Sequence, residues 1–233
     1  SFMIKIAFQG RNLKLRAKIR HKIDQRIWAE IFKIKEYRID ETTICSAKYS
    51  IIDVGAHIGF FILYARDLNP TVDIYALEPE PKNFLALKNN LNLNKFKKIT
   101  VINSALSDQS GEATLLMAVD NHNHRLVKNY NQNQNTFTIP TISLSDLIKK
   151  YKLKKISLLK MDIEGWEYMI FKNLDSKVLS KISAIIMEYH NNRENNYREI
   201  AIFLRENGFG VQIFPSKFDK TLGFLFANNK RLR

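Results

Sequence analysis

Short apolar runs alternate with segments of helical periodicity from residue 48 onward, and this alternation predicts the fold. Apolar runs of this length, bounded by polar or turn residues, are typical of buried strands. The strands expected are 50–54, 72–78, 99–105, 112–119, 137–142, 156–162, 182–189, 209–214 and 222–227. The helices expected are 60–66, 81–93, 145–151, 164–174 and 194–207. Because strands and helices alternate, we expect one α/β domain over 48–233 with a doubly wound, mostly parallel sheet. Its last two strands are expected to close the sheet as an antiparallel hairpin.

Residues 1–47 show a different pattern, in which isoleucines recur along a basic segment. They are spaced by four and three, so that they share one face of a helix: Ile19, Ile23, Ile27, Ile31 and Ile34. Basic residues occupy many of the other positions: Arg11, Lys14, Arg16, Lys18, Arg20, Lys22 and Arg26. We expect a basic helix or helix pair over 13–35, docked on the main domain, and a short strand within 37–47. The alternative is contact of the basic face with an anionic membrane surface or a phosphorylated carrier.

The segment 50–60 contains the first candidate site. A buried strand ends with Asp53 and Val54, Gly55 and Gly59 bracket a tight turn, and an apolar helix follows. Such a turn lets a nucleotide-like ligand approach bare backbone and the unpaired N–H groups of the helix start. The glycine spacing differs from the G-x-G-x-x-G pattern that cradles a pyrophosphate. A carboxylate at Asp53 would repel a pyrophosphate and attract an ammonium or sulfonium group. S-adenosylmethionine carries both cations and no phosphate.

A second acid ends the next predicted strand. Glu78 lies 23 residues after Gly55. A carboxylate at this point can accept hydrogen bonds from both ribose hydroxyls of a nucleoside. Either Asp53 or Glu78 alone is best interpreted as an ordinary strand-end residue. Together, with a glycine turn between them, they predict S-adenosylmethionine as the cofactor.

Polar residues at the ends of two later strands are candidates for catalysis. Asp162 and Glu164 follow one predicted strand, and Glu188 and His190 end another. Ligands of open α/β sheets bind beyond the carboxyl ends of the strands, so these side chains converge above the glycine turn if the two strands are neighbours. An acid or imidazole there can remove the proton of an acceptor hydroxyl during methyl transfer. Topology favours Asp162, and the near-neutral titration of imidazole favours His190. Glu164 has a structural alternative, the first turn of a helix, where the dipole favours carboxylates.

An asparagine-rich segment, 120–136, separates two of the predicted strands. Long polar loops of this kind commonly carry substrate contacts, which makes His122 and His124 candidates for that role. These histidines have no third ligand at a suggestive spacing, so we expect no metal site in the loop. A hard cation held by Asp162 and Glu188 is an open alternative.

The 233-residue chain has a formal net charge of +14. A positive field speeds encounters with phosphates of nucleic acid, anionic lipid or sugar carriers, but a lysine-rich composition from genome base bias explains the charge equally well.

The single cysteine, Cys45, excludes an intrachain disulfide and is typical of a reducing compartment. No apolar run approaches the roughly 20 residues that span a bilayer, and no secretory leader is visible. We therefore expect a cytoplasmic protein, with peripheral membrane contact as an open alternative.

Four blocks of this chain, in this order, resemble the FkbM family of S-adenosylmethionine-dependent methyltransferases. They are Ile52 to Gly59, Leu77 to Pro79, Ser104 to Asp108, and Leu159 to Glu167. The glycine block is common to many methyltransferases, whereas the Lys-x-Asp-x-Glu-Gly-x-Glu pattern of the last block is much more specific. One departure is His57, where the family usually carries asparagine.

The resemblance implies a class I methyltransferase (Rossmann-like) fold and O-methylation, most often of sugars in glycans, of glycolipids or of secondary metabolites. It implies that Asp53, Gly55 and Glu78 hold the cofactor and that Ser104 and Ala105 flank the adenine. The candidate contacts are Asp53, Gly55, Ala56, His57, Gly59, Phe60, Glu78, Pro79, Ser104 and Ala105.

The leading hypothesis is therefore an O-methyltransferase that acts on a glycan, glycolipid or small-molecule acceptor. The first alternative is an RNA ribose methyltransferase that uses the basic surface, with Lys160, Asp162 and Glu188 as a lysine–carboxylate set. The second alternative is a non-catalytic module that docks through the basic N-terminal helix, which leaves the polar strand ends unexplained.

Overall fold

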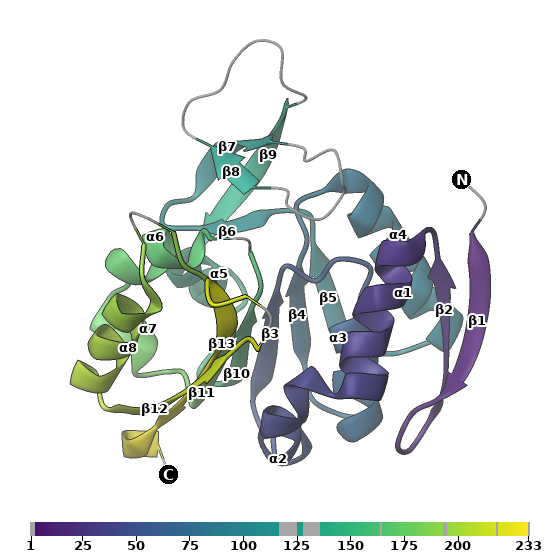
Figure 1. The fold of residues 1–233 in the computed structure, drawn as a ribbon, viewed down its shortest axis with the longest axis horizontal. Coiled ribbons are helices and arrows are strands. Elements are labelled where there is room, and N and C mark those ends of the chain that lie inside the picture. Colours follow the sequence, from purple (N-terminus) through teal and green to yellow (C-terminus); the bar gives the residue numbers. More distant parts are fainter. Residues whose placement is uncertain are drawn as a thin grey trace.

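The computed structural model describes residues 3–116, 125–127, 136–163, 165–192, 195–217 and 219–232. A seven-stranded sheet lies at the centre of this described part, in the order β12-β13-β11-β10-β3-β4-β5 (Figure 1). Its strands are β3 (Ser50–Val54), β4 (Ile74–Leu77), β5 (Ile99–Ile102), β10 (Ile156–Met161), β11 (Ala184–His190), β12 (Phe209–Pro215) and β13 (Leu222–Asn229). All run parallel except β13, which is antiparallel to both β11 and β12. The predicted doubly wound sheet with an antiparallel closing hairpin is confirmed.

Helices cover both faces of the sheet, because side chains of each strand alternate between the two faces. One face packs against α3 (Phe60–Leu68) and α4 (Pro81–Asn94). The other packs against α5 (Leu144–Lys150), α6 (Glu167–Lys172), α7 (Ser176–Leu179) and α8 (Tyr197–Glu206). The neighbours Ile51 and Ile52 of β3 accordingly belong to two different hydrophobic clusters. The short helix α7 is absent from the sequence prediction.

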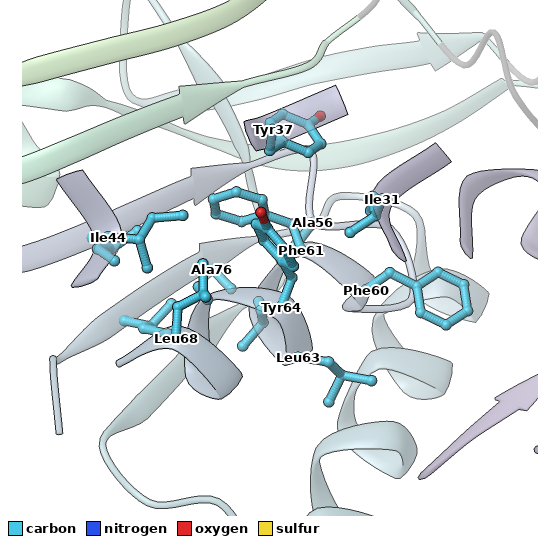
Figure 2. Packing of buried hydrophobic residues seen from close by; sticks show 14 of the residues in the cluster. Ile31, Tyr37, Ile44, Ala56, Phe60, Phe61, Leu63, Tyr64, Leu68 and Ala76 are labelled. Carbon is cyan, nitrogen blue, oxygen red and sulfur yellow. The ribbon is translucent and has the colours of Figure 1, made fainter. Parts of the chain in front are cut away.

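The helix α3 is enclosed on all sides, and each of its residues is buried. Figure 2 shows Phe61 and Tyr64 of α3 within a cluster that also contains Tyr37 and Ile44 from the N-terminal segment. The rings of Phe61 and Tyr37 meet edge to face, with centroids 5.1 Å apart. Apart from Arg66 and Asp67, its residues are apolar on every face, which is typical of a helix buried on all sides. Here the N-terminal segment supplies the outer cover.

The N-terminal segment begins with a β-hairpin, so the helix predicted over 13–35 is wrong for its first part. Strands β1 (Ile4–Gln9) and β2 (Lys14–Ile19) pair antiparallel, and helix α1 (Lys22–Ala29) and the π-helical turn η1 (Glu30–Ile34) follow. In β2 the residues alternate between exposed or half-buried and fully buried, with Leu15, Ala17 and Ile19 inside. This period of two is a strand pattern. Ile19 fits both the strand period of two and the helical spacing of the isoleucines that follow. The sequence pattern therefore indicated a helix where the structure has a strand.

The strand predicted within 37–47 is also wrong. This segment instead forms the 3₁₀ turn η2 (Glu36–Asp40) and the short helix α2 (Glu41–Cys45), with Ile44 buried against α3. The proposed domain boundary after residue 47 stays a prediction, although the hairpin and α3 share one hydrophobic cluster.

A smaller four-stranded sheet stands at the edge of the domain in the order β6-β9-β7-β8 (Figure 1). It comprises β6 (Ala105–Ser107), β7 (Gly111–Leu116), β8 (Arg125–Val127) and β9 (Thr136–Ser143). The predicted strands 112–119 and 137–142 correspond to β7 and β9, which pair antiparallel. The strand predicted over 99–105 divides into β5 and β6. Most of the polar segment 120–136, including His122 and His124, lies outside the described residues.

Within the described ranges, the structure contains no helix that is both long and apolar enough to cross a membrane.

Candidate active site

The candidate site lies where the strand order of the central sheet reverses direction. The chain leaves β3 for β4 and β5 on one side, then crosses to β10 and β11 on the other. Ligands of open α/β sheets bind at such a switch point, beyond the carboxyl ends of the strands. Asp53 of β3 and Lys160 of β10 are partners in the register of this central pair, so both side chains lie on the face covered by α3.

The loop after β3 requires glycine because it touches the loop after β10. Gly55 has a φ of +75°, and a Cβ added there would lie 1.9 Å from the carbonyl oxygen of Asp162. Gly59, with a φ of +93°, directly precedes α3. The N–H groups of Gly55 and Ala56 both donate to the carbonyl oxygen of Leu77 at the end of β4. The glycine loop (55–59) is thereby attached to both neighbouring strands.

Lys160 is the counter-ion of Asp53. Its Nζ lies 3.1 Å from Asp53 Oδ1 and donates to the carbonyl oxygen of Gly55 at 3.1 Å, and both side chains are buried. Burial alone would lower the pKa of Lys160, but Asp53 and Asp162 raise it above its ordinary value, so the ammonium group stays charged. We expected Asp53 to face a cation of the cofactor; in the structure the cation it contacts is Lys160. Its contact with the cofactor stays a prediction.

Carboxylates outnumber cations around Lys160. Asp162 Oδ2 lies 3.8 Å from Lys160 Nζ, and its side chain is 32% exposed, which leaves it accessible to a ligand. Glu188 of β11 also contributes to the field at Lys160. Three carboxylates around one ammonium group give this sheet edge a negative local charge, although the whole chain carries +14. Such a field favours a cationic ligand.

Glu78 follows β4 and is buried beside the glycine loop. Its carboxylate accepts hydrogen bonds from the N–H of His57 at 2.8 Å, from the N–H of Glu80 at 3.0 Å, and from Asn83 Nδ2 at 3.4 Å. Burial raises the pKa of Glu78 to about 7, although these bonds act in the opposite direction. The next residue, Pro79, is half-buried, and its carbonyl oxygen accepts a hydrogen bond from Asn103. Glu78 and the glycine loop are thus adjacent, and the predicted contact of Glu78 with ribose hydroxyls stays a prediction.

Ser104, in the link between β5 and β6, and Ala105, the first residue of β6, are both buried. Ser104 Oγ donates a hydrogen bond of 2.9 Å to the carbonyl oxygen of Pro140 in β9, and this bond joins the two sheets. Phe60 is buried at the start of α3, next to Gly59. The structure therefore places these residues at the loops that follow β3 and β5, and their roles toward adenine and cofactor stay predictions.

The strands β10 and β11 are parallel neighbours, so Asp162, Glu188 and His190 come to the same edge of the sheet, as expected. His190 Nδ1 lies 3.6 Å from Oε1 of Glu167, a fully buried carboxylate at the start of α6 that also accepts the N–H of Ile163. Glu164 lies outside the described residues.

Among the sequence-based catalytic candidates, Lys160 appears only in the lysine–carboxylate set of the RNA alternative, and Glu167 does not appear. Both lie in the Lys-x-Asp-x-Glu-Gly-x-Glu pattern, and a lysine inside an otherwise apolar strand is itself a signal of function.

The residues present fit S-adenosylmethionine. Asp53 is buried, its Oδ1 faces Lys160, and its Oδ2 accepts no hydrogen bond from a described residue. The glycine loop begins and ends with glycine, and Glu78 offers carboxylate oxygens beside it. Among the residues that the structure describes, no group of three or more His, Cys, Asp or Glu side chains is arranged to hold a metal ion.

The profile of the Methyltransferase FkbM domain matches residues 53–211, well over half of the chain. This chain belongs to the FkbM methyltransferase family. It is 26% identical to the 31-O-demethyl-FK506 methyltransferase FkbM of Streptomyces tacrolimicus over 190 residues, which cover 69% of this chain and 72% of that protein. It is 25% identical to the hexuronic acid methyltransferase AglP of Haloferax volcanii over 170 residues, which cover 69% of this chain and 66% of that protein.

Among solved structures, the crystal structure of methyltransferase FkbM from Methylobacillus flagellatus KT superimposes with a TM-score of 0.55 at 16% identity. The match covers 78% of this chain but 45% of that one, so this chain spans less than half of that protein. At this identity the likeness shows the fold alone. The family match and the fold make this chain a methyltransferase with a class I, Rossmann-like fold, and membership of the family implies the use of S-adenosylmethionine.

Proposed function

We propose that this FkbM-family methyltransferase transfers a methyl group from S-adenosylmethionine to a hydroxyl of a sugar, a glycan or another small-molecule acceptor. The observation that carries the proposal is the cluster of Asp162, Glu188 and His190 at the adjoining ends of β10 and β11, beside the Lys160–Asp53 pair. Two relatives support the acceptor class, since one is named for an O-demethylated FK506 and the other for a hexuronic acid.

When bound, S-adenosylmethionine supplies a methyl group on a positively charged sulfur. The acceptor oxygen bonds to the methyl carbon while the carbon–sulfur bond breaks, and the hydroxyl proton passes to a base of this chain. In this proposal Asp162 is that base, since its carboxylate is accessible and lies at the switch point. Lys160 holds Asp162 from the buried side. His190, held by Glu167, is the alternative base.

Cofactor binding is assigned to the two loops that precede α3 and α4. The glycine loop supplies main-chain groups, and Glu78 accepts the ribose hydroxyls. For the acceptor, the chemistry at the ends of β10 and β11 requires only a hydroxyl, so it fits sugars and hydroxylated small molecules alike.

The proposal is tested with methyl-labelled S-adenosylmethionine and a panel of hexuronic acids, nucleotide sugars, glycolipids and RNA. We expect label on a hydroxyl of a sugar or another small molecule. The variant Asp162→Asn is expected to lose turnover by about 10²–10⁴-fold while it keeps its affinity for S-adenosylhomocysteine. The matched control is Asp146→Asn, on the exposed face of α5, which is expected to retain full activity.

Transfer of label to RNA alone would contradict the proposed acceptor class. Full activity of Asp162→Asn, together with loss in His190→Gln, would move the role of base to His190.

A further inference from the structure

The N-terminal segment lies outside the family match, yet one of its carboxylates reaches the glycine loop. Asp24, in the first turn of α1, is fully buried. It accepts three hydrogen bonds from Arg20, from the main-chain N–H at 2.8 Å, from Nε at 3.1 Å and from Nη2 at 3.1 Å. Its Oδ1 also lies 3.7 Å from Nε2 of His57 and 3.7 Å from Nδ1 of His21. The buried carboxylate thus joins α1 to the loop that follows β3.

A second route connects the same segment to Glu78. Arg20 Nη2 donates to Asn83 Oδ1 at 2.8 Å, and Asn83 Nδ2 donates to Glu78 Oε1 at 3.4 Å. The main-chain N–H of His57 donates to the other oxygen of Glu78 at 2.8 Å. These contacts form a closed ring, the Asp24 ring, whose members are Asp24, His57, Glu78, Asn83 and Arg20. His57 and Glu78 are both candidate cofactor contacts. The main-chain N–H of His57 is bonded to Glu78 while its imidazole lies beside Asp24, and Glu78 accepts from both His57 and Asn83.

The Asp24 ring is well placed to fix the positions of the His57 imidazole and the Glu78 carboxylate. Its acids and Asn83 are buried, and polar networks in such surroundings rigidify the residues that they join. Because Asp24 is matched by the guanidinium of Arg20, its carboxylate is not an isolated buried charge. Removing its charge leaves Arg20 without its ionic partner, so that Asn83 is its remaining side-chain acceptor in the ring, and the disturbance extends to both the imidazole of His57 and the carboxylate of Glu78.

We propose that Asp24 is a positioning residue of the cofactor site, which acts through His57 and, by way of Arg20 and Asn83, through Glu78. The inference rests on the proposed function, because it assigns the glycine loop and Glu78 to the cofactor. It makes the N-terminal segment a working part of the binding site in addition to a cover for α3.

The test measures the dissociation constant of S-adenosylhomocysteine by isothermal titration calorimetry, with the melting temperature measured beside it. Asp24→Asn is expected to weaken binding at least tenfold. The matched control is Asp67→Asn, because Asp67 is a second buried acid that ties the N-terminal segment to α3. Asp67 lies in the last turn of α3, at the end away from the glycine loop, and accepts the N–H groups of Asn12 and Leu13. We expect Asp67→Asn to have a lower melting temperature than the wild type, while its dissociation constant for S-adenosylhomocysteine stays within twofold of the wild-type value.

Arg20→Lys is the second variant, and it keeps the proposal testable if Asp24→Asn does not fold. Lysine keeps the charge beside Asp24 but has a single nitrogen in place of the guanidinium fork that binds Asp24 and Asn83 together, so we expect at least threefold weaker binding. Unchanged affinity in Asp24→Asn or in Arg20→Lys overturns the positioning role. Equal weakening by Asp67→Asn overturns it as well, since it shows a general effect of stability. Failure of the wild type to bind would instead overturn the assigned cofactor and with it the proposed function.

Discussion

At the scale of single residues, the site is built from ionisable groups that are buried and partly compensated. Lys160 keeps its charge because acids surround it. Three N–H groups donate to Glu78, but no cation of the described residues pairs with it, so burial dominates and raises its pKa to about 7. A carboxyl group with a raised pKa in the folded state binds a proton that the unfolded chain has already released. The free energy of unfolding therefore depends on pH through the titration of Glu78.

We predict that Glu78 lowers the stability of the ligand-free protein as pH rises. Its contribution is fully present below the unfolded pKa of about 4.5 and is lost as pH rises through the folded pKa of about 7. Between pH 5 and pH 7.5 the wild type should lose about 2 kcal/mol relative to Glu78→Gln, from 1.4 kcal/mol per pKa unit. Urea unfolding of both proteins at the two pH values measures this difference. Parallel pH profiles for the two proteins would contradict the prediction.

At the scale of elements, the N-terminal hairpin is completed by side chains of a helix. The outer edge of β2 bonds to two asparagines of α4, one turn apart. Asn90 accepts the N–H of Lys18 at 2.7 Å, and Asn94 accepts the N–H of Arg16 at 2.9 Å and donates to its carbonyl oxygen at 2.7 Å. An exposed strand edge presents unpaired N–H and C=O groups, and the two amides satisfy them here as a neighbouring strand would.

We predict that Asn90→Ala lowers the free energy of unfolding by about 1–3 kcal/mol, because buried main-chain groups of Lys18 and Ile58 lose their partner. The neighbouring Asn89→Ala is the matched control, since Asn89 makes no side-chain hydrogen bond with any residue that the structure describes. Its effect should stay within about 0.5 kcal/mol. Urea unfolding gives both values, and hydrogen exchange at Lys18 should quicken only in Asn90→Ala. Equal effects of the two substitutions would count against the edge contact.

At the scale of the whole molecule, the net charge of +14 and the negative edge of the sheet have opposite signs. The surface charge favours anions at a distance, whereas Asp53, Asp162 and Glu188 favour a cation at the site itself. The charge of the whole chain therefore says little about the ligand. The local arrangement of charges at the switch point determines which ligand the site favours.

We predict that S-adenosylhomocysteine, at a hundred times its dissociation constant, stabilises the protein by about 2.7 kcal/mol. For a chain of this length that corresponds to a rise in melting temperature of about 5–10 °C. NAD at the same concentration is the control and should produce no rise, because the acid-flanked glycine loop disfavours a pyrophosphate. Differential scanning fluorimetry measures both. An equal or larger rise with NAD would contradict the electrostatic assignment of the site.

The sequence by itself determined the features that depend on neighbours a few residues apart. The alternation of strands and helices, the glycine turn with its acids at Asp53 and Glu78, and the family blocks are of this kind. Each is visible because periodicity and turn chemistry are local properties of the chain.

Only the tertiary structure decided which distant groups meet. That Asp53 faces Lys160, that Glu167 holds His190 and that Asp24 reaches His57 all depend on how separate segments pack around the sheet. The hairpin belongs to the same class, since a short segment such as 14–19 becomes a strand through the surface that it packs against. Such contacts arise from the combined fit of the whole core, which no window of neighbouring residues contains.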